Sequence, residues 1–174
     1  MRLLVRLTLV GLVALVAIGF LLNRTSPTNP EVRSSVVSVG QCVESGTSLV
    51  IDFGSNSDSS LIQKCVSNYS GTSWNLFAAA GLEVSGTEQY PVGFVCRING
   101  YPTESAEKCT STPGATTGSW AFFISNAGKW EYSPVGSAGH RTKCGTAEGW
   151  RFLSPTEGLT TPPRVKPIIH SCEK

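Results

Sequence analysis

The sequence predicts an α+β domain in which one short helix lies on a mixed β-sheet of four or five strands. Three observations lead to this prediction: short runs rich in β-branched and aromatic residues, one segment with helical spacing, and six cysteines that all follow an apolar N-terminal run. The chain of 174 residues is 40% apolar and 15% charged. This composition excludes a disordered charged chain and a coiled coil, and the single long apolar run excludes a protein with many membrane spans.

Residues 1–22 have the pattern of an export signal. Arg2 and Arg6 precede an uncharged run over residues 7–22, which as a helix reaches about 24 Å against a hydrocarbon core of about 30 Å. No A-x-A pattern of small residues follows the run. We therefore favour an uncleaved signal anchor, single-pass in the cell membrane with the C-terminal domain outside the cytoplasm. A cleaved signal peptide, which makes the protein secreted, is the alternative.

Residues 23–40 are rich in Ser, Thr, Pro and Asn without apolar periodicity, so we expect a linker there. Residues 41–174 then form one extracytoplasmic domain. Three arginines lie in the leader, which leaves 11 Lys and Arg against 12 Asp and Glu. Because nucleic-acid binding needs a dense cationic face, this balance argues against a nucleic-acid partner.

All six cysteines lie in the exported part, and an even number there predicts disulfides. No C-x-x-C occurs, so we expect no metal site. Six cysteines allow 15 connectivities, and the sequence does not choose among them. We predict pairing between neighbours along the chain: Cys42 with Cys65, Cys96 with Cys109, and Cys144 with Cys172.

The first elements of the domain are a strand and a helix. Thr47–Phe53 is β-branched and closed by Gly54, as is typical of a buried strand. Leu61–Tyr69 fits either a strand or a helical turn. A helix follows, which Thr72 or Ser73 begins and a glycine ends. Its predicted apolar face consists of Trp74, Phe77, Ala78 and Gly81.

The second half of the domain is mostly strands. We expect Val92–Ile98 to be a strand followed by a tight turn at Asn99-Gly100, and residues 103–118 to be a polar loop. Ser119–Ser125 and Lys129–Ser133 form a hairpin, and Gly149–Leu153 is the last strand. A Pro-rich tail held by Cys172 follows. One helix across such a sheet buries both apolar faces, so we predict a disulfide-stapled fold of the β-grasp kind.

Catalytic patterns are scarce. The chain has neither G-x-S-x-G nor H-E-x-x-H, and no phosphate-binding glycine loop. His140 lies in a Gly-rich loop and His170 in the tail, outside any motif. Asp52 is the one acid inside an apolar strand, without an assignable second carboxylate. We therefore expect no enzymatic activity and no cofactor.

Aromatic residues gather on the last strands. Side chains alternate along a strand, so Trp120 and Phe122 share one face and Ala121 and Phe123 share the other. One helix cannot cover both faces, which leaves an aromatic ledge on the outer face or at the hairpin rim. Such a ledge is suited to a flat apolar ligand or a partner protein. The candidate ligand-binding residues are Trp120, Phe122, Trp130 and Tyr132.

Several motifs resemble a known family. The helix T-S-W-N-L-F-A-A-A-G-L precedes G-F-V-C-R-I-N-G-Y-P, and G-S-W-A-F-F-I-S with its hairpin precedes G-W-R-F. Over about Thr47 to Phe152 the chain resembles the C-terminal β-domain of transcobalamin and intrinsic factor and related bacterial exported domains. The cysteine-rich form is similar to an actinobacterial exported family.

The resemblance implies a role in binding. In the vitamin carriers this domain contacts one side of a cobalamin, and a large helical barrel that this chain lacks holds the other side. We therefore expect a membrane-tethered or secreted binding module for a corrinoid-like flat ligand, completed by an uptake transporter or second protein. The alternative is an envelope module that docks another protein without a small ligand.

Overall fold

The computed structural model describes residues 35–54, 61–113 and 116–172. The expected signal segment and most of the expected linker lie outside these ranges. No helix within them is long and apolar enough to cross a membrane.

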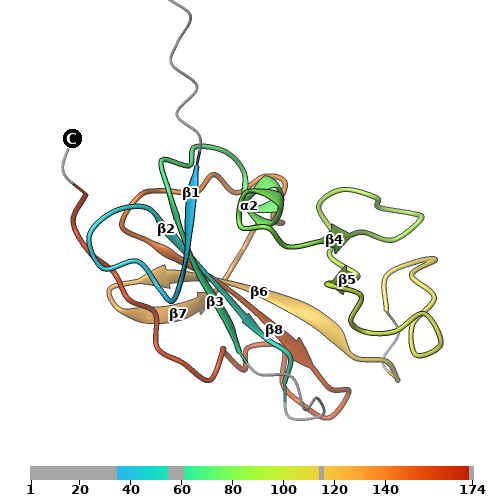
Figure 1. Cartoon of the computed structure of the whole chain (residues 1–174). Helices are drawn as coiled ribbons and strands as arrows, with labels where there is room; N and C mark the ends of the chain where they lie inside the picture. Colours follow the sequence, from blue (N-terminus) through green and yellow to red (C-terminus); the bar gives the residue numbers. More distant parts are fainter. Residues whose placement is uncertain (1–34, 55–60, 114–115, 173–174) are drawn as a thin grey trace, which may run out of the picture. The chain divides into compact units, whose positions relative to one another are not determined.

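A mixed sheet of six strands forms the centre of the domain (Figure 1). Its strand order is β1-β3-β2-β8-β6-β7, and β2 and β8 run parallel while every other neighbouring pair is antiparallel. A separate two-stranded ladder joins β4 and β5. The strands of the large sheet are β1 (Val36–Val39), β2 (Thr47–Asp52), β3 (Ile62–Ser67), β6 (Ser119–Asn126), β7 (Lys129–Tyr132) and β8 (Ala147–Leu153), and those of the small ladder are β4 (Val84–Ser85) and β5 (Arg97–Ile98).

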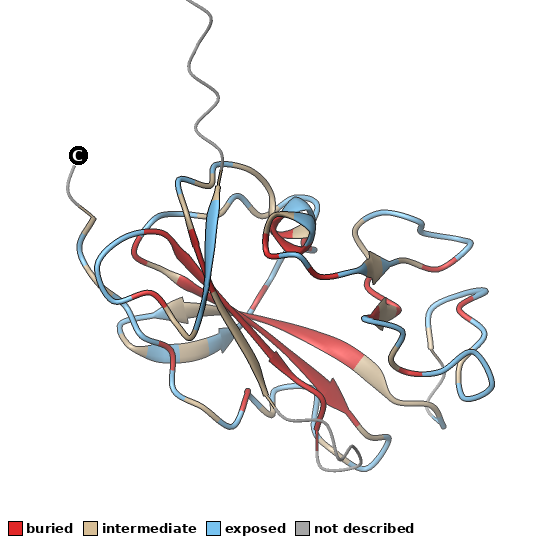
Figure 2. Ribbon diagram, viewed as in Figure 1, coloured by how far each residue is buried: buried red, intermediate tan, exposed pale blue. Residues whose placement is uncertain are grey.

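The middle of the sheet is buried and its first edge is exposed. Every residue of β2 and β8 is buried, as parallel strands covered on both faces usually are, whereas every residue of β1 is exposed. Figure 2 shows this contrast along the strands. Over the described residues the architecture is therefore a small, sheet-rich α+β domain with one short helix, in line with the predicted class.

Helix α2 (Ser73–Ala79) covers one face of the sheet. Thr72 begins it, because the Thr72 hydroxyl accepts a hydrogen bond from the Asn75 amide. The residues that face the core are Ser73, Leu76 and Phe77. The predicted face is partly confirmed: Phe77 lies in the core and Trp74 packs against it. It was wrong for Ala78 and Gly81, which are exposed, and Leu76 takes the other core position. Leu76 has much more apolar surface to bury than an alanine.

Two sequence-based boundaries are corrected by the strand pairing. Val36–Val39 was assigned to the linker but forms β1, which pairs with β3 and makes the sheet six-stranded rather than four- or five-stranded. Of the expected strand Val92–Ile98, only Arg97–Ile98 forms a strand. At the start of this segment Gly93 has a φ of +100°, which extended backbone does not reach. The ambiguous segment 61–69 contains strand β3.

Several predictions from local pattern are confirmed. The hairpin of β6 and β7 turns at Ala127-Gly128, where both residues have positive φ. Asn99 and Gly100 also have positive φ and connect a bridge between Ile98 and Tyr101. The three disulfides are Cys42–Cys65, Cys96–Cys109 and Cys144–Cys172, as predicted.

Candidate functional site

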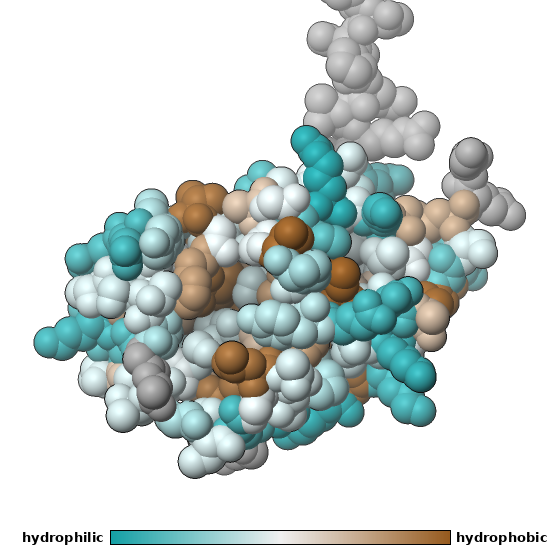
Figure 3. Space-filling view, turned by 180° about the vertical axis from the view of Figure 1, so that it is seen from behind, coloured by the Kyte–Doolittle hydropathy of each residue, from teal (hydrophilic) through white to brown (hydrophobic). Residues whose placement is uncertain are grey.

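A hollow of about 300 Å³ lies beside β6, β7 and β8, and we call it the aromatic hollow. Three core aromatic side chains of the sheet, Trp120, Phe122 and Trp150, are part of its lining. The loop at Gly93–Val95 and the segment from Tyr132 to Ser137 complete it. Figure 3 shows the back of the molecule, where hydrophobic side chains gather around a recess.

The aromatic side chains of the hollow are held rigidly by one another. Phe122 and Trp150 are cross-strand partners, and their rings stack with centroids 4.6 Å apart and planes 17° apart. Trp120 meets Phe152 edge to face at 5.4 Å, and its indole N–H donates to the Tyr101 carbonyl. Such ring pairs stabilise the folded protein beyond the effect of their buried area. The wall of the hollow therefore does not need a ligand to form.

The rim of the hollow is exposed and apolar. Tyr132 keeps 49% of its surface exposed and Val135 keeps 48%, whereas Trp120 and Phe122 are each only 7% exposed. Buried aromatic walls below an exposed apolar rim are suited to the edge of a flat molecule or to an inserted side chain.

The four predicted ligand residues divide between the two faces of the sheet. Trp120 and Phe122 border the aromatic hollow on the helix side of the sheet. Tyr132 also borders it, but its ring packs edge to face against Phe123 on the opposite side of the sheet, with centroids 5.7 Å apart. Trp120 and Phe122 point toward the helix and belong to the main core, so they do not form a ledge on the outer face. Trp130 lies on the opposite face with Phe123. That face is covered by the C-terminal tail, which the sequence analysis did not place.

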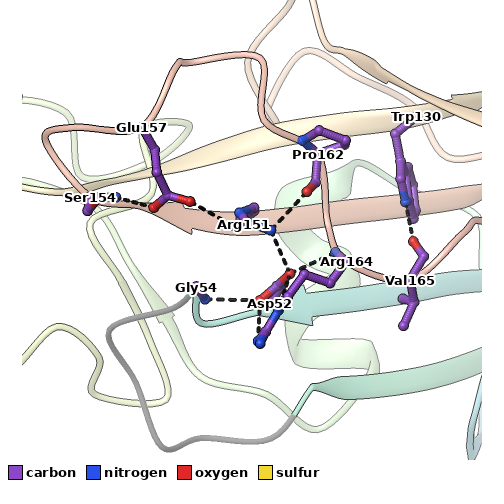
Figure 4. Close-up of polar contacts among 9 residues, drawn as sticks. All are labelled: Asp52, Gly54, Trp130, Arg151, Ser154, Glu157, Pro162, Arg164 and Val165. Carbon is purple, nitrogen blue, oxygen red and sulfur yellow. Dashed lines mark hydrogen bonds and ion pairs between the residues drawn. The ribbon is translucent and has the colours of Figure 1, made fainter.

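The tail crosses the outer face of the sheet (Figure 4). The indole N–H of Trp130 donates to the Val165 carbonyl at 2.6 Å, and the ring lies over Gly149 together with Pro163. A side chain at residue 149 would meet both of them within about 3 Å. Trp130 is therefore occupied by the tail rather than open to a ligand.

An ion-pair network fastens the same tail (Figure 4). Asp52 is fully buried and accepts hydrogen bonds from the Arg164 backbone at 2.8 Å and from its guanidinium at 2.7 Å. Arg151 contacts Asp52 at 3.3 Å and Glu157 at 2.6 Å. Burial raises the pKa of Asp52, but the hydrogen bonds from Arg164 and Gly54 outweigh it, so the pKa lies below its ordinary value. Asp52 therefore stabilises the tail as a carboxylate.

A second buried acid lies on the helix face. Glu148 is 1% exposed, and neither carboxylate oxygen has a hydrogen-bond partner among the described residues. Burial raises the pKa of Glu148 to about 8, although the nearby Ser73 hydroxyl opposes the rise. The nearest cation-forming group is His140, whose Nε2 is 3.6 Å from Oε1 of Glu148. Burial, with the nearby Lys143 charge, lowers the pKa of His140. At neutral pH the pair is therefore mostly uncharged.

The His140–Glu148 pair adjoins the aromatic hollow. The His140 ring meets Phe122 edge to face with centroids 5.7 Å apart. The sequence analysis missed Glu148 because it began the last strand at Gly149, two residues after its actual start at Ala147. In the run A-E-G-W-R-F-L, alternation puts Glu148 on the same face as Trp150 and Phe152, and this signal could have found it.

The described residues show no arrangement typical of nucleophilic catalysis. Ser137 borders the hollow, but its hydroxyl donates to the Gly93 carbonyl at 3.1 Å rather than to His140. His170 lies beside Cys144 and Cys172, with ligand-type atoms within 4.8 Å of one another. Those two sulfurs form a disulfide, so as oxidised they are not thiolate ligands for a metal.

A larger groove of about 670 Å³ lies between α2 and the β4–β5 ladder. Trp74, Leu82 and Arg97 are among its lining residues. The guanidinium of Arg97 is already bound to the carbonyls of Pro102 and Glu107. The Arg97 guanidinium is therefore not free to bind a ligand in this groove. We take the aromatic hollow as the better candidate for a binding site.

No protein-family model, curated protein or solved structure matches this chain. The resemblance to the cobalamin carriers thus stays a prediction from the quoted motifs. The evidence for a ligand-binding site is therefore the geometry of the aromatic hollow.

Proposed function

We propose that this chain is a non-enzymatic, extracytoplasmic binding module that holds a flat, largely apolar ligand in the aromatic hollow. The observation that carries the proposal is the rigid wall of Trp120, Phe122 and Trp150 below an exposed apolar rim. Three disulfides support a location outside the cytosol, where they persist. The module is anchored in the cell membrane or secreted, depending on the fate of residues 1–22.

The β-grasp fold is part of the same proposal. Its support is the topology: a hairpin of β2 and β3, a helix, a hairpin of β6 and β7, and a last strand, β8, inserted parallel to β2. Strand β1 is then an addition at one edge.

The ligand class follows from the resemblance and from the size of the hollow. About 300 Å³ is the lower end of the range for small-molecule pockets, so it accommodates one ring system or the edge of a larger molecule. A corrinoid is larger, and only its edge would enter. A transporter or a second protein would then cover the remaining surface of the ligand.

The test is a titration of the full, oxidised chain with cobalamin and cobinamide, followed by tryptophan fluorescence corrected for absorption by the ligand. Trp120 and Trp150 are in the wall, so saturable quenching is the expected result. Isothermal titration calorimetry gives an independent affinity.

Two aromatic residues serve as variant and control for this experiment. Phe94 borders the hollow and is half-buried, whereas Tyr90 is 49% exposed and is not among the residues that border it. We expect Phe94→Ala to weaken binding about tenfold and Tyr90→Ala to leave it unchanged. Equal effects, or no saturable quenching by either corrinoid up to high micromolar concentration, would remove the support for this ligand class.

A protein-docking role is the second candidate. The exposed Val135 at the rim favours it, since a partner's side chain can insert into the hollow as readily as a small molecule. Under this alternative the corrinoid titration fails, and a rim substitution such as Val135→Glu lowers retention of an envelope partner.

A further inference from the structure

The disulfide Cys144–Cys172 is more accessible than the other two. Cys144 is exposed and Cys172 is half-buried. The remaining four cysteines are all buried: Cys42, Cys65, Cys96 and Cys109. Because thiol–disulfide exchange requires direct approach of the attacking sulfur, a reductant reaches Cys144–Cys172 first. This disulfide is therefore the one whose sulfurs can become thiols while the rest of the chain stays cross-linked.

Each sulfur of this disulfide has a polar neighbour. The Gly46 amide donates to Sγ of Cys144 at 3.2 Å, and Nε2 of His170 lies 3.7 Å from Sγ of Cys172. An amide donor or an adjacent imidazolium stabilises a thiolate more than a thiol. Reduction therefore leaves the two sulfurs in surroundings that favour the thiolate, which is the form that binds metals.

His170 completes a cluster of three potential metal ligands. Its imidazole and the sulfurs of Cys144 and Cys172 offer ligand atoms that all lie within 4.8 Å of one another. Nδ1 of His170 is buried without a hydrogen-bond partner among the described residues, so no bond from it holds the ring away from the sulfurs. In a tetrahedral zinc site, Zn–S bonds of about 2.3 Å place two sulfurs about 3.8 Å apart. Small rotations of the two cysteine side chains reach that separation once the disulfide opens.

The backbone keeps these residues together without the disulfide. The His170 amide donates to the Gly145 carbonyl at 3.1 Å, and the Gly145 amide donates to the Gly46 carbonyl at 2.8 Å. Neither bond involves a sulfur, so reduction does not remove them. The ligands therefore begin close to one another, which lowers the entropic cost of bringing them to a metal.

A hollow of about 550 Å³ adjoins His170. Glu44 and Ser171 are among its lining residues, and the negative charge of Glu44 favours a cation nearby. A zinc ion with three protein ligands keeps a fourth position for water. The hollow provides the space for that water.

We propose that Cys144, Cys172 and His170 bind Zn²⁺ when a dithiol reduces the disulfide Cys144–Cys172. The dithiol is oxidised to its own disulfide, its two electrons and two protons pass to the two cysteine sulfurs, and Zn²⁺ displaces these protons when it binds. Two thiolates and one imidazole form a ligand set that suits Zn²⁺ rather than Mg²⁺ or Ca²⁺. The metal then replaces the disulfide as the link between Cys144 and the tail.

The site departs from the expectation of no metal site, which came from the absence of C-x-x-C. Its two cysteines are 28 residues apart in the sequence and meet only in the folded chain.

Stepwise reduction of the full chain tests the accessibility. Detergent keeps the apolar leader dispersed, the chain is treated with rising concentrations of dithiothreitol, and free thiols are alkylated and located by mass spectrometry. We expect Cys144 and Cys172 to be modified before any other cysteine. Earlier opening of another disulfide, or joint opening of all three, overturns the proposal.

Cobalt tests the metal site, because Co²⁺ occupies zinc sites and is coloured. Dithiothreitol is removed under nitrogen from the chain with one opened disulfide, and Co²⁺ is added. We expect a thiolate-to-cobalt charge-transfer band and the intense visible bands of four-coordinate cobalt, both of which Zn²⁺ abolishes. The oxidised chain and the double variant Cys144→Ser/Cys172→Ser should show neither. Absence of the bands in the reduced parent chain, or their presence in either control, refutes the site.

The two histidines of the chain make a matched pair of variants. His170→Ala removes one of three ligands, so we expect it to raise the Zn²⁺ dissociation constant of the reduced chain by more than about tenfold. His140→Ala removes the histidine outside the site and should leave the constant unchanged. Competition with a chromophoric chelator measures both constants. Equal constants for the two variants would contradict ligation by His170 and overturn the proposed site.

Discussion

The two faces of the central sheet each bury an acid, but in opposite electrostatic states. Asp52 lies under the tail, where Arg164, Arg151 and the Gly54 amide surround its carboxylate and its pKa is lowered. Glu148 lies under the helix without a hydrogen-bond partner among the described residues, and its pKa is raised to about 8. Both side chains are almost inaccessible to solvent, but Glu148 lies deeper in the protein and is desolvated more than Asp52. The difference in charge comes from this desolvation together with the partners that the tail supplies to Asp52.

The comparison is tested most strongly by neutralising each acid in turn. Asp52→Asn removes the carboxylate that Arg164 and Arg151 share. Because Arg151 keeps its pair with Glu157, we expect the free energy of unfolding to fall by about 3 kcal/mol, the lower end for a broken buried ion pair. Glu148→Gln removes a buried acid that has no cationic partner at neutral pH, so we expect no loss or a gain. Urea unfolding at pH 7 measures both. Similar losses in the two variants would contradict the contrast between the faces.

The next largest loss of stability is expected from releasing the C-terminal tail. The disulfide Cys144–Cys172 closes a segment of 28 residues and holds the end of the tail. Replacing both cysteines by serine should cost about 3 kcal/mol and, by loosening Arg164, raise the pKa of Asp52 toward its ordinary value. Acid unfolding should then begin at higher pH than in the parent chain. An unchanged acid transition would show that the tail stays docked without its disulfide.

The pH dependence of stability sharpens the comparison further. The folded pKa of Glu148 is about 8 against an ordinary value of 4.5, so its stabilising contribution is complete below 4.5 and is lost as pH rises through 8. His140 acts in the opposite sense, since its lowered pKa gives a contribution that is complete above 6.5 and is lost on acidification. Between pH 6.5 and 8 only Glu148 of this pair therefore changes stability.

We expect the free energy of unfolding to fall by up to about 1.4 kcal/mol per pH unit in that window. Urea unfolding at half-unit intervals measures the slope. The Glu148→Gln variant is the control, because it has no proton to lose there. If its slope equals that of the parent chain, another group is responsible.

The smallest expected effect concerns two tryptophans. Trp130 donates to the Val165 carbonyl of the tail, whereas the indole nitrogen of Trp150 is buried without a partner among the described residues. Trp130→Phe should lose about 1 kcal/mol from the hydrogen bond in addition to ring volume. Trp150→Phe loses ring volume but removes an unsatisfied N–H, which offsets part of the cost. Thermal unfolding compares the two. A larger loss in Trp150→Phe would show that packing on the helix face outweighs the bond to the tail.

Sequence reasoning succeeded where the information is local. The hairpin of β6 and β7 follows from an alternating aromatic run and a turn that contains Gly128. The ends of α2 follow from Thr72 and Gly81, whose preferences do not depend on the rest of the fold. It failed for β1, because V-V-S-V is too short to indicate a strand until β3 lies beside it.

For the candidate site, the sequence identified the residue types but not their arrangement. Alternation correctly separated Trp120 and Phe122 from Phe123. It did not tell which face the helix covers, so it did not place Trp120 and Phe122 in the core under the helix. The sequence around Trp130 did not indicate that the tail covers it. Its indole N–H donates to the carbonyl of Val165, which lies 35 residues later in the chain.

By itself the sequence determined a disulfide-linked α+β domain, its hairpin and its helix ends, whereas the choice of cysteine pairs is established by the fold. The aromatic hollow, the covered outer face and the opposite states of Asp52 and Glu148 came only from tertiary structure. The physical reason is the distance along the chain: Arg164 binds Asp52 across 112 residues. No local pattern encodes such a contact, because it depends on where the folded sheet directs the tail.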